Sequence, residues 1–193
     1  AYILTGYFNL VKVLEIMLNS GIDPKSGKLI GIETGDTGRF TNFNDLQEAF
    51  NRQLKHFIDI KIKGNNIIER IFTKYMPVPF LSLLVDDCIA NGKDYNAGGA
   101  RYNSSYIQGV GLGSITDMLT SIKYHLFDEK SFSWAELKHA MDTNFEGFDQ
   151  MRAQLVYDTP KYGNDEDYAD EQATWVFEAF YDAVNGRPSP RGA

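Results

Sequence analysis

The sequence predicts a helix-rich α/β fold. Most of its 193 residues lie in segments whose apolar side chains recur at helical spacing, and residues 106–112 form one short apolar run thinned by glycine, which is typical of a buried strand. The hydrophobic content of 43%, with 13 Phe and 11 Tyr, is typical of a densely packed chain. One strand cannot form a sheet, so we expect these helices to cover a sheet formed largely elsewhere.

The first half of the chain predicts two helices separated by a loop. Apolar residues at helical spacing over 2–19 predict the first helix, and residues 27–40, rich in Gly and Thr, predict an excursion loop. Asn42 is a suitable N-cap for a long helix that ends before Pro77. Gly64 lies inside this helix at a cost of ~1 kcal/mol, so a kink is possible there.

The second half predicts one strand among shorter helices. A short helix over residues 80–90 is followed by a polar loop and then the strand at 106–112. The remaining helices are expected at residues 116–125, 133–144, 148–157 and 165–184, the second of them opened by the capping box of Ser133 and Glu136.

Composition and charge exclude several classes of protein. Lys plus Arg is 19 and Asp plus Glu is 26, giving a net charge of −7 without a basic cluster, so nucleic acid is not an expected partner. No apolar run approaches the ~18 residues of a membrane span. The single cysteine, Cys88, excludes an intrachain disulfide framework and suggests a reducing compartment, with cytoplasm as the default.

The familiar site motifs are absent or incomplete. Gly109, Gly111 and Gly113 do not have the spacing of a dinucleotide fingerprint, and packing is the favoured reason for them. The acidic run 165–170 lacks the glycine and the final glutamate of a calcium loop. None of the three histidines or Cys88 has a partner at metal-ligand spacing, so no metal site is expected.

The segment Asp94–Asn103 is the densest polar loop of the chain. It contains two Gly, two Asn, two Tyr and one Arg directly before the predicted strand. Such a loop either forms a hydrogen-bonded corner of the fold or lines a site, and its composition favours neither.

Five ordered stretches resemble one enzyme family. They are Gly98-Gly-Ala-Arg-Tyr-Asn103, Tyr106-Ile-Gln-Gly-Val-Gly-Leu-Gly113, Thr116-Asp-Met-Leu-x-x-Ile-Lys123, Asn144-Phe-Glu-Gly147 and Thr159-Pro-Lys-Tyr-Gly-Asn164 with the acidic run after it. Together they resemble the glycyl radical enzymes of the pyruvate formate-lyase-like type. The opening Leu4-Thr-Gly-Tyr-Phe-Asn9 and Asn19-x-Gly-Ile-Asp-Pro24 are most similar to the trans-4-hydroxy-L-proline dehydratase branch.

The resemblance implies that the chain is part of a ten-stranded α/β barrel. Such enzymes carry a radical-forming Cys in a Cys-Val-Glu-like motif and a radical-storing Gly in an Arg-Val-x-Gly-Tyr-like motif. Cys88 is followed by Ile89 and Ala90, and no Arg has Gly three positions on, so no catalytic residue is expected here. The chain begins without Met and ends in a loop, so 1–193 is expected to be one central-to-C-terminal segment, with the Cys before Ala1 and the glycine radical domain absent.

The resemblance also implies partners and substrate contacts. The full enzyme would hold no bound cofactor other than its glycyl radical, installed by an S-adenosylmethionine iron–sulfur activating enzyme under anaerobic conditions, and would act as a homodimer on a small molecule. Tyr7 is expected at the substrate, with a core aromatic as an equally good alternative. Asn103 and Gln108 are weaker candidates for which a structural role is favoured.

The expected reaction is removal of water from trans-4-hydroxy-L-proline. The alternatives within the family are dehydration of glycerol or propanediol and formate C-acetyltransfer. An alternative of another class is a non-catalytic truncated remnant.

Overall fold

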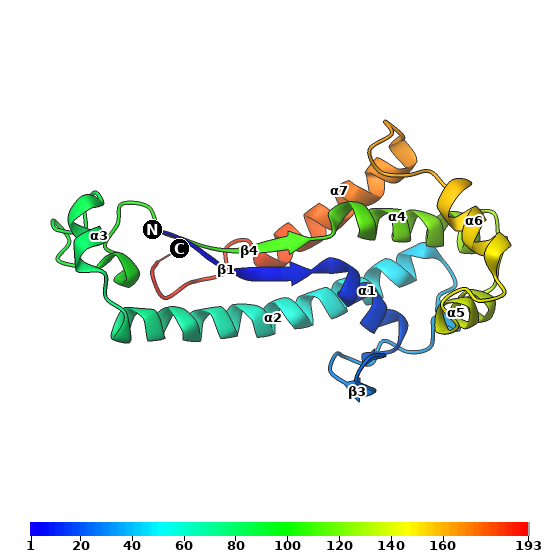
Figure 1. Cartoon of the computed structure of the whole chain (residues 1–193), viewed down its shortest axis with the longest axis horizontal. Coiled ribbons are helices and arrows are strands. Elements are labelled where there is room, and N and C mark those ends of the chain that lie inside the picture. The colour runs from blue at the N-terminus through cyan, green and yellow to red at the C-terminus, as the bar shows by residue number, and fades with distance from the viewer. Residues whose placement is uncertain (193) are drawn as a thin grey trace. The chain divides into compact units, whose positions relative to one another are not determined.

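The structure is a computed structural model that describes residues 1–192, with the backbone alone for residues 2–5. The chain forms two compact units (Figure 1). Unit 1 comprises Ala1–Phe8, Phe57–Val110 and Asp182–Ala193, and unit 2 comprises Asn9–His56 and Gly111–Tyr181. Two helices, α2 (Phe43–Tyr75) and α7 (Asp167–Val184), contribute residues to both units.

Unit 1 is built on a two-stranded sheet of β1 (Tyr2–Asn9) and β4 (Ser104–Val110). The two arrows point the same way in Figure 1, so the strands are parallel. Among the side chains of these strands that the structure describes, Phe8 and Ile107 are apolar and buried. The remaining elements of unit 1 are the second half of α2, α3 (Pro79–Leu84) and a short 3-10 turn at Tyr95–Ala97.

The helix predicted over residues 2–19 is wrong for its first half, because residues 2–9 form β1. The run contains Tyr2, Ile3, Thr5, Tyr7 and Phe8, and aromatic and β-branched residues suit a pleated surface better than a helix. The helix α1 begins only at Leu10, where the Oδ1 of Asn9 accepts the N–H of Lys12 at 3.1 Å. Ile3 and Leu4 are among the apolar residues at helical spacing that predicted this helix, and their side chains lie outside the described residues.

Unit 2 is a helical assembly around one apolar core. It contains α1 (Leu10–Leu18), the first half of α2, α4 (Leu112–Ile122), α5 (Trp134–Asp142), α6 (Asp149–Tyr157) and most of α7. A small antiparallel ribbon pairs β2 (Ile22–Asp23) with β3 (Lys28–Leu29). The largest fully buried apolar side chains of this core are Met17, Leu46, Phe50, Leu54, Ile115, Leu119 and Val176.

Sequence signals for helix ends are confirmed in unit 2. The Oδ1 of Asn42 accepts the N–H of Asp45 at 3.0 Å at the start of α2, which continues through Gly64 without interruption. Ser133 and Glu136 form the capping box of α5. The predicted helix at 116–125 is longer, because a π-helical turn at Lys123–Asp128 follows α4 directly.

Cys88 was expected on a helix, and this is also wrong. The helix α3 ends at Leu84, and Asp87 adopts a positive φ of 74°, which a helix does not allow. Cys88 is buried in the turns that follow.

None of the helices described over residues 1–192 combines the length and the apolar content that crossing a bilayer requires.

Candidate functional site

The three predicted substrate residues lie in unit 1, at two different places. Tyr7 belongs to β1 and Gln108 to β4, whereas Asn103 ends the polar loop before β4. The structure therefore brings Tyr7 and Gln108 onto one sheet.

The helix α2 covers one face of this sheet. A Cβ built on Gly6 would lie 2.6 Å from the Nζ of Lys61 on α2, so the Gly6 side of β1 faces that helix. Ser105 and Ile107 on β4 line a small recess together with Ile62 of α2, so their side of β4 faces the same helix.

Tyr7 and Gln108 project from the opposite face, because successive side chains of a strand alternate between the two faces. Tyr7 is 66% exposed and Gln108 is also exposed within the described residues, so neither belongs to the core of this chain. A phenol and a carboxamide on one open sheet face can donate and accept hydrogen bonds to a polar ligand.

Asn103 has a different position, inside the turn that leads into β4. Its side-chain amide donates to the carbonyl oxygens of Gly98 at 3.3 Å and Ala100 at 3.0 Å. Its Oδ1 is buried and has no hydrogen-bond donor among residues 1–192. The amide nitrogen of Asn103 thus holds the loop in place, and its Oδ1 is available to accept a hydrogen bond.

The loop Asp94–Asn103 is a hydrogen-bonded corner. The carboxylate of Asp94 accepts the N–H groups of Val78 and Asn96 and the hydroxyl of Ser82, all at 2.8 Å. Burial opposes ionisation of Asp94, but these donors together hold the pKa of its carboxyl below the usual range. The loop also lines a cavity of about 590 Å³ together with Ala1 and Leu84, so it is a corner of the fold and a cavity wall at the same time.

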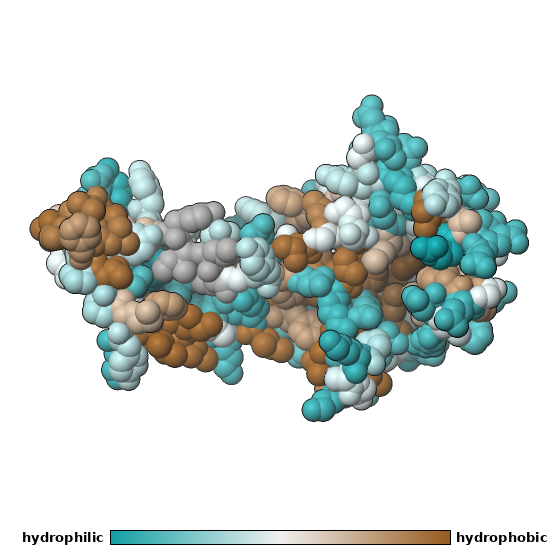
Figure 2. Space-filling view, in the orientation of Figure 1, coloured by the Kyte–Doolittle hydropathy of each residue, from teal (hydrophilic) through white to brown (hydrophobic). Residues whose placement is uncertain are grey.

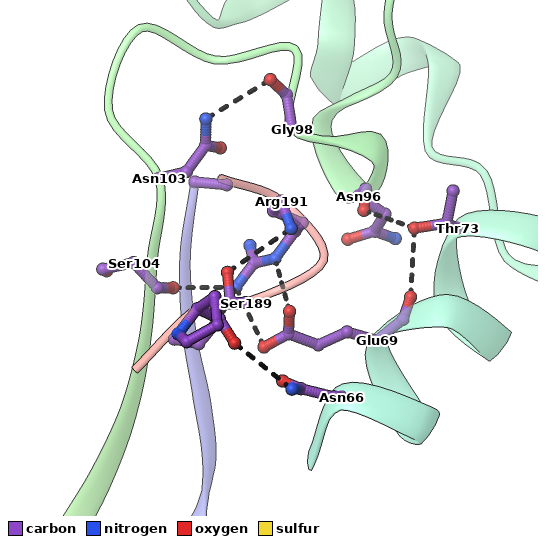
Figure 3. A network of polar contacts seen from close by, with 12 residues as sticks. Asn66, Glu69, Thr73, Asn96, Gly98, Asn103, Ser104, Ser189 and Arg191 are labelled. Carbon is purple, nitrogen blue, oxygen red and sulfur yellow. Dashed lines mark hydrogen bonds and ion pairs between the residues drawn. The ribbon is translucent and has the colours of Figure 1, made fainter. Parts of the chain in front are cut away.

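A buried ion pair joins this corner to α2 and to the last residues of the chain (Figure 3). The Nε of Arg191 lies 3.2 Å from the Oε2 of Glu69, and both side chains are 1% exposed. The Nη2 of Arg191 also donates to the carbonyl of Ser104 at 2.7 Å and the hydroxyl of Ser105 at 3.0 Å. A charge removed from water needs such partners, so Arg191 fixes the start of β4 against α2.

The sequence interpretation did not find this pair. One signal was present in the sequence. Glu69 follows Ile67 and Ile68 and precedes Ile71, and a single carboxylate in such an apolar run indicates a buried polar partner. Its partner is 122 residues away in a Pro-rich loop, and no local pattern connects the two.

Gly111 directly precedes α4 and packs closely, whereas Gly113 lies inside that helix. Gly111 has a φ of +88°, and a Cβ there would lie 3.2 Å from the Cγ2 of Val11. A Cβ on Gly113 would lie 3.4 Å from the ring of Tyr162, an ordinary van der Waals distance that does not require glycine. Among residues 1–192 the structure shows no cluster of three His, Cys, Asp or Glu side chains able to hold a metal ion.

His125 is buried in unit 2 beside the π-helical turn. Its Nε2 lies 2.9 Å from the Oγ1 of Thr159, its Nδ1 lies 3.3 Å from the Oγ of Ser131, and its ring stacks on Phe132. Burial lowers the pKa of this imidazole, and the nearby ammonium of Lys161 lowers it further.

Comparisons with known proteins agree with one another. The chain is 56% identical over 192 residues to the trans-4-hydroxy-L-proline dehydratase of Clostridioides difficile, covering 100% of this chain and 24% of that protein. The crystal structure of that organism's hydroxyproline dehydratase with trans-4-hydroxy-L-proline bound superposes with a TM-score of 0.98 at 55% identity, covering 100% and 24% of the two chains. The glycerol-bound glycerol dehydratase of Clostridium butyricum gives a TM-score of 0.91 at 35% identity, covering 97% and 23%.

The chain thus spans about a quarter of the length of these relatives. The predicted fold class, a helix-rich α/β piece of a larger barrel, is confirmed by the superpositions. The resemblance found in the motifs is confirmed as well. The family described as pyruvate formate lyase-like matches residues 1–193, and the chain belongs to that family.

Proposed function

We propose that this chain is part of a glycyl radical dehydratase that removes water from trans-4-hydroxy-L-proline. The observation that carries the proposal is the whole-chain similarity to a hydroxyproline dehydratase, 56% in sequence with a TM-score of 0.98 to its substrate-bound structure. The similarity to a glycerol dehydratase is lower at every measure, with 35% identity and a TM-score of 0.91.

The chain's own contribution would be to bind and orient the substrate. The open sheet face offers the hydroxyl of Tyr7 and the carboxamide of Gln108, and the corner offers the Oδ1 of Asn103. A cyclic amino acid carries a carboxylate, an amine and a hydroxyl, so such donors and acceptors match its chemistry.

The radical chemistry would come from residues outside this chain. Within residues 1–192 the one cysteine, Cys88, is 2% exposed in a turn and is not positioned as a nucleophile. A glycyl radical supplies hydrogen-atom abstraction when it is present, and we propose that an S-adenosylmethionine iron–sulfur enzyme installs it. We also propose that the whole enzyme is a cytoplasmic homodimer that acts in the absence of oxygen.

The test measures water loss by the activated whole protein. Trans-4-hydroxy-L-proline, glycerol and 1,2-propanediol are supplied separately under anaerobic conditions, and product formation is followed by mass spectrometry. We expect kcat/KM for hydroxyproline to exceed that for either diol by at least about 100-fold, because a site with polar groups placed for a substrate rejects one that leaves them unpaired.

Two results contradict the proposal. Faster dehydration of glycerol or propanediol would assign the protein to the diol dehydratases. Radical formation, detected by electron paramagnetic resonance, without turnover of any of the three compounds would show that the substrate belongs to another class.

A further inference from the structure

Residues 158–166, here called the strap, join α6 to α7 and are fastened to α4 by polar contacts. The carboxylate of Asp117 accepts the N–H of Tyr162 at 2.9 Å. One turn further along α4, the hydroxyl of Ser121 accepts a hydrogen bond from the ammonium of Lys161 at 3.2 Å. The strap is thus bound to two successive turns of one helical face.

His125 makes the third contact, one turn beyond Ser121 in the π-helical turn. Its Nε2 lies 2.9 Å from the Oγ1 of Thr159, and Thr159 donates its own hydroxyl proton to the carbonyl of Gln154 at 3.2 Å. The Oγ1 of Thr159 therefore accepts from Nε2, so Nε2 carries the proton of the neutral ring. Nδ1 is then the acceptor, 3.3 Å from the Oγ of Ser131. The contacts at His125 fit a neutral imidazole.

The surroundings of His125 disfavour a second proton on its ring. Among the described residues, the charged groups that face it are Lys161 and Asp158 of the strap and Glu129 after the π-helical turn. Burial lowers the pKa of His125, and the ammonium of Lys161 lowers it further. These effects outweigh the two carboxylates and the carbonyl of Gln154, which favour the imidazolium. The closed strap therefore prefers the neutral ring.

Apart from these contacts, little holds the strap. Among the described residues, Thr159 is the one strap residue that is buried, and residues 162–166 are exposed. Asp117, Ser121 and Lys161 line a cavity of about 490 Å³, so the strap does not close tightly over α4. Figure 2 shows that the surface between α6 and the start of α7 is largely hydrophilic. A segment held by polar contacts at the surface opens at a lower free energy than a packed core.

We propose that the strap is a pH-sensitive latch, which stays bound to α4 while His125 is neutral and is released when His125 takes up a proton. Opening of the strap exposes the imidazole to water, where it titrates as an ordinary histidine, at roughly pH 6.5. Below that pH the open form binds a proton that the closed form does not, so the opening constant rises by up to about tenfold per pH unit. The latch goes beyond the proposed function and is independent of the substrate.

The test measures amide hydrogen exchange of the whole protein by mass spectrometry from about pH 7.5 to about pH 5.5. Each rate is corrected for the intrinsic pH dependence of amide exchange. The N–H of Tyr162 is the reporter, because its bond to Asp117 exists only while the strap is closed. Residues 46–56 of α2 are the reference. We expect protection of the strap to fall about 3- to 10-fold over this range, with protection of the reference unchanged.

Two variants separate the proton from the fastening. His125→Gln keeps a side chain that can donate and accept hydrogen bonds but does not titrate, so protection of its strap should stay constant over the same range. Asp117→Asn weakens the acceptor of the Tyr162 N–H and leaves His125 in place. It should lower protection of the strap by a similar factor at every pH and keep the wild-type slope.

Three results overturn the proposal. Constant protection of the wild-type strap would show that the strap does not open as pH falls. An equal loss in residues 46–56 would assign the effect to unfolding of a larger unit. A wild-type slope in His125→Gln would assign the proton to another group, such as Asp158 or Glu129.

Discussion

Arg191 and Glu69 are both removed from water, so each depends on the other. Replacing Arg191 by Met leaves the carboxylate of Glu69 buried and unpaired, and we expect the free energy of unfolding to fall by about 3 to 5 kcal/mol. Urea denaturation of the whole protein measures this loss. The double variant Glu69→Met with Arg191→Met should recover much of it, since no charge is then left unpaired.

A double variant as unstable as Arg191→Met alone would contradict this account. The cost would then come from the lost bonds of Arg191 to Ser104 and Ser105 rather than from an unpaired charge.

His125 makes stability depend on pH. Its folded-state pKa lies below that of an unfolded histidine, because burial disfavours the imidazolium. As pH falls from 7 toward 5, the unfolded chain takes up a proton at this residue that the folded chain does not, so stability is lost. The urea midpoint of His125→Gln should vary less over this range than that of the wild type.

The matched control for that experiment is His139→Gln. His139 is exposed and contacts Phe148 edge-on, so its replacement removes an imidazole without disturbing a buried site. A flattened profile in His139→Gln, or an unchanged one in His125→Gln, would contradict the assignment to His125.

Tyr7 is the residue whose role in binding is most open to test. If its hydroxyl bonds the substrate, Tyr7→Phe in the activated whole protein should lower kcat/KM by about 10-fold, the value of one hydrogen bond, with no change in Tm. The control Tyr157→Phe removes the hydroxyl of a tyrosine that is 81% exposed in unit 2 and should change neither quantity. Full activity in Tyr7→Phe would show that the hydroxyl of Tyr7 does not bind substrate.

At the scale of single elements, the start of α5 depends on one hydroxyl. The Oγ of Ser133 accepts the N–H of Glu136 at 3.2 Å, and the carboxylate of Glu136 accepts the N–H of Ser133 at 2.8 Å. The hydroxyl and the N–H of Ser133 both donate to the carboxylate of Glu136 and hold the pKa of that carboxyl below its usual range. Ser133→Ala should destabilise the protein by about 1 kcal/mol in urea denaturation.

The control is Thr174→Ala, which removes an exposed hydroxyl bonded to the carbonyl of Asp170 within α7. Its effect should stay within about 0.5 kcal/mol, as for most surface substitutions. Equal losses in the two variants would mean that the hydroxyl of Ser133 does not act as a cap.

Elements with local signals could be predicted from the sequence, and those set by distant contacts could not. Asn42, Ser133 and the prolines after α2 define helix ends within a few residues. The apolar residues of segment 2–9 also recur at helical spacing, but the segment forms a strand because it pairs with β4, about a hundred residues later. The sequence of loop 94–103 could not show whether it forms a corner or lines a site, because its hydrogen bonds reach Ser82 and Thr73, which lie outside the loop.

The candidate site shows the same limit. Tyr7 was proposed through a family resemblance rather than through spacing, and its exposure on an open sheet face could be known only once β1 was paired. Arg191 could not be predicted at all, because an arginine in a loop is ordinarily solvated.

At the scale of the whole molecule, two units share their helices. Unit 1 has few elements and a large exposed apolar surface on α2 and α3, whereas unit 2 has its own core around Phe50 and Met17. The described chain is also only a quarter of the length of its relatives.

The order of segments in unit 1 has a consequence for synthesis on the ribosome. Ser104 donates its N–H to the carbonyl of Ala1, and Arg191 bonds Glu69 from 122 residues away. Translation adds roughly 5 to 20 residues per second, so β4 is synthesised about 5 to 20 s after β1. Arg191, which completes the ion pair with Glu69, is synthesised later still. During that interval the nascent chain exposes an unpaired strand, so we expect its yield in cells to depend on chaperones that bind before residue 191 is made.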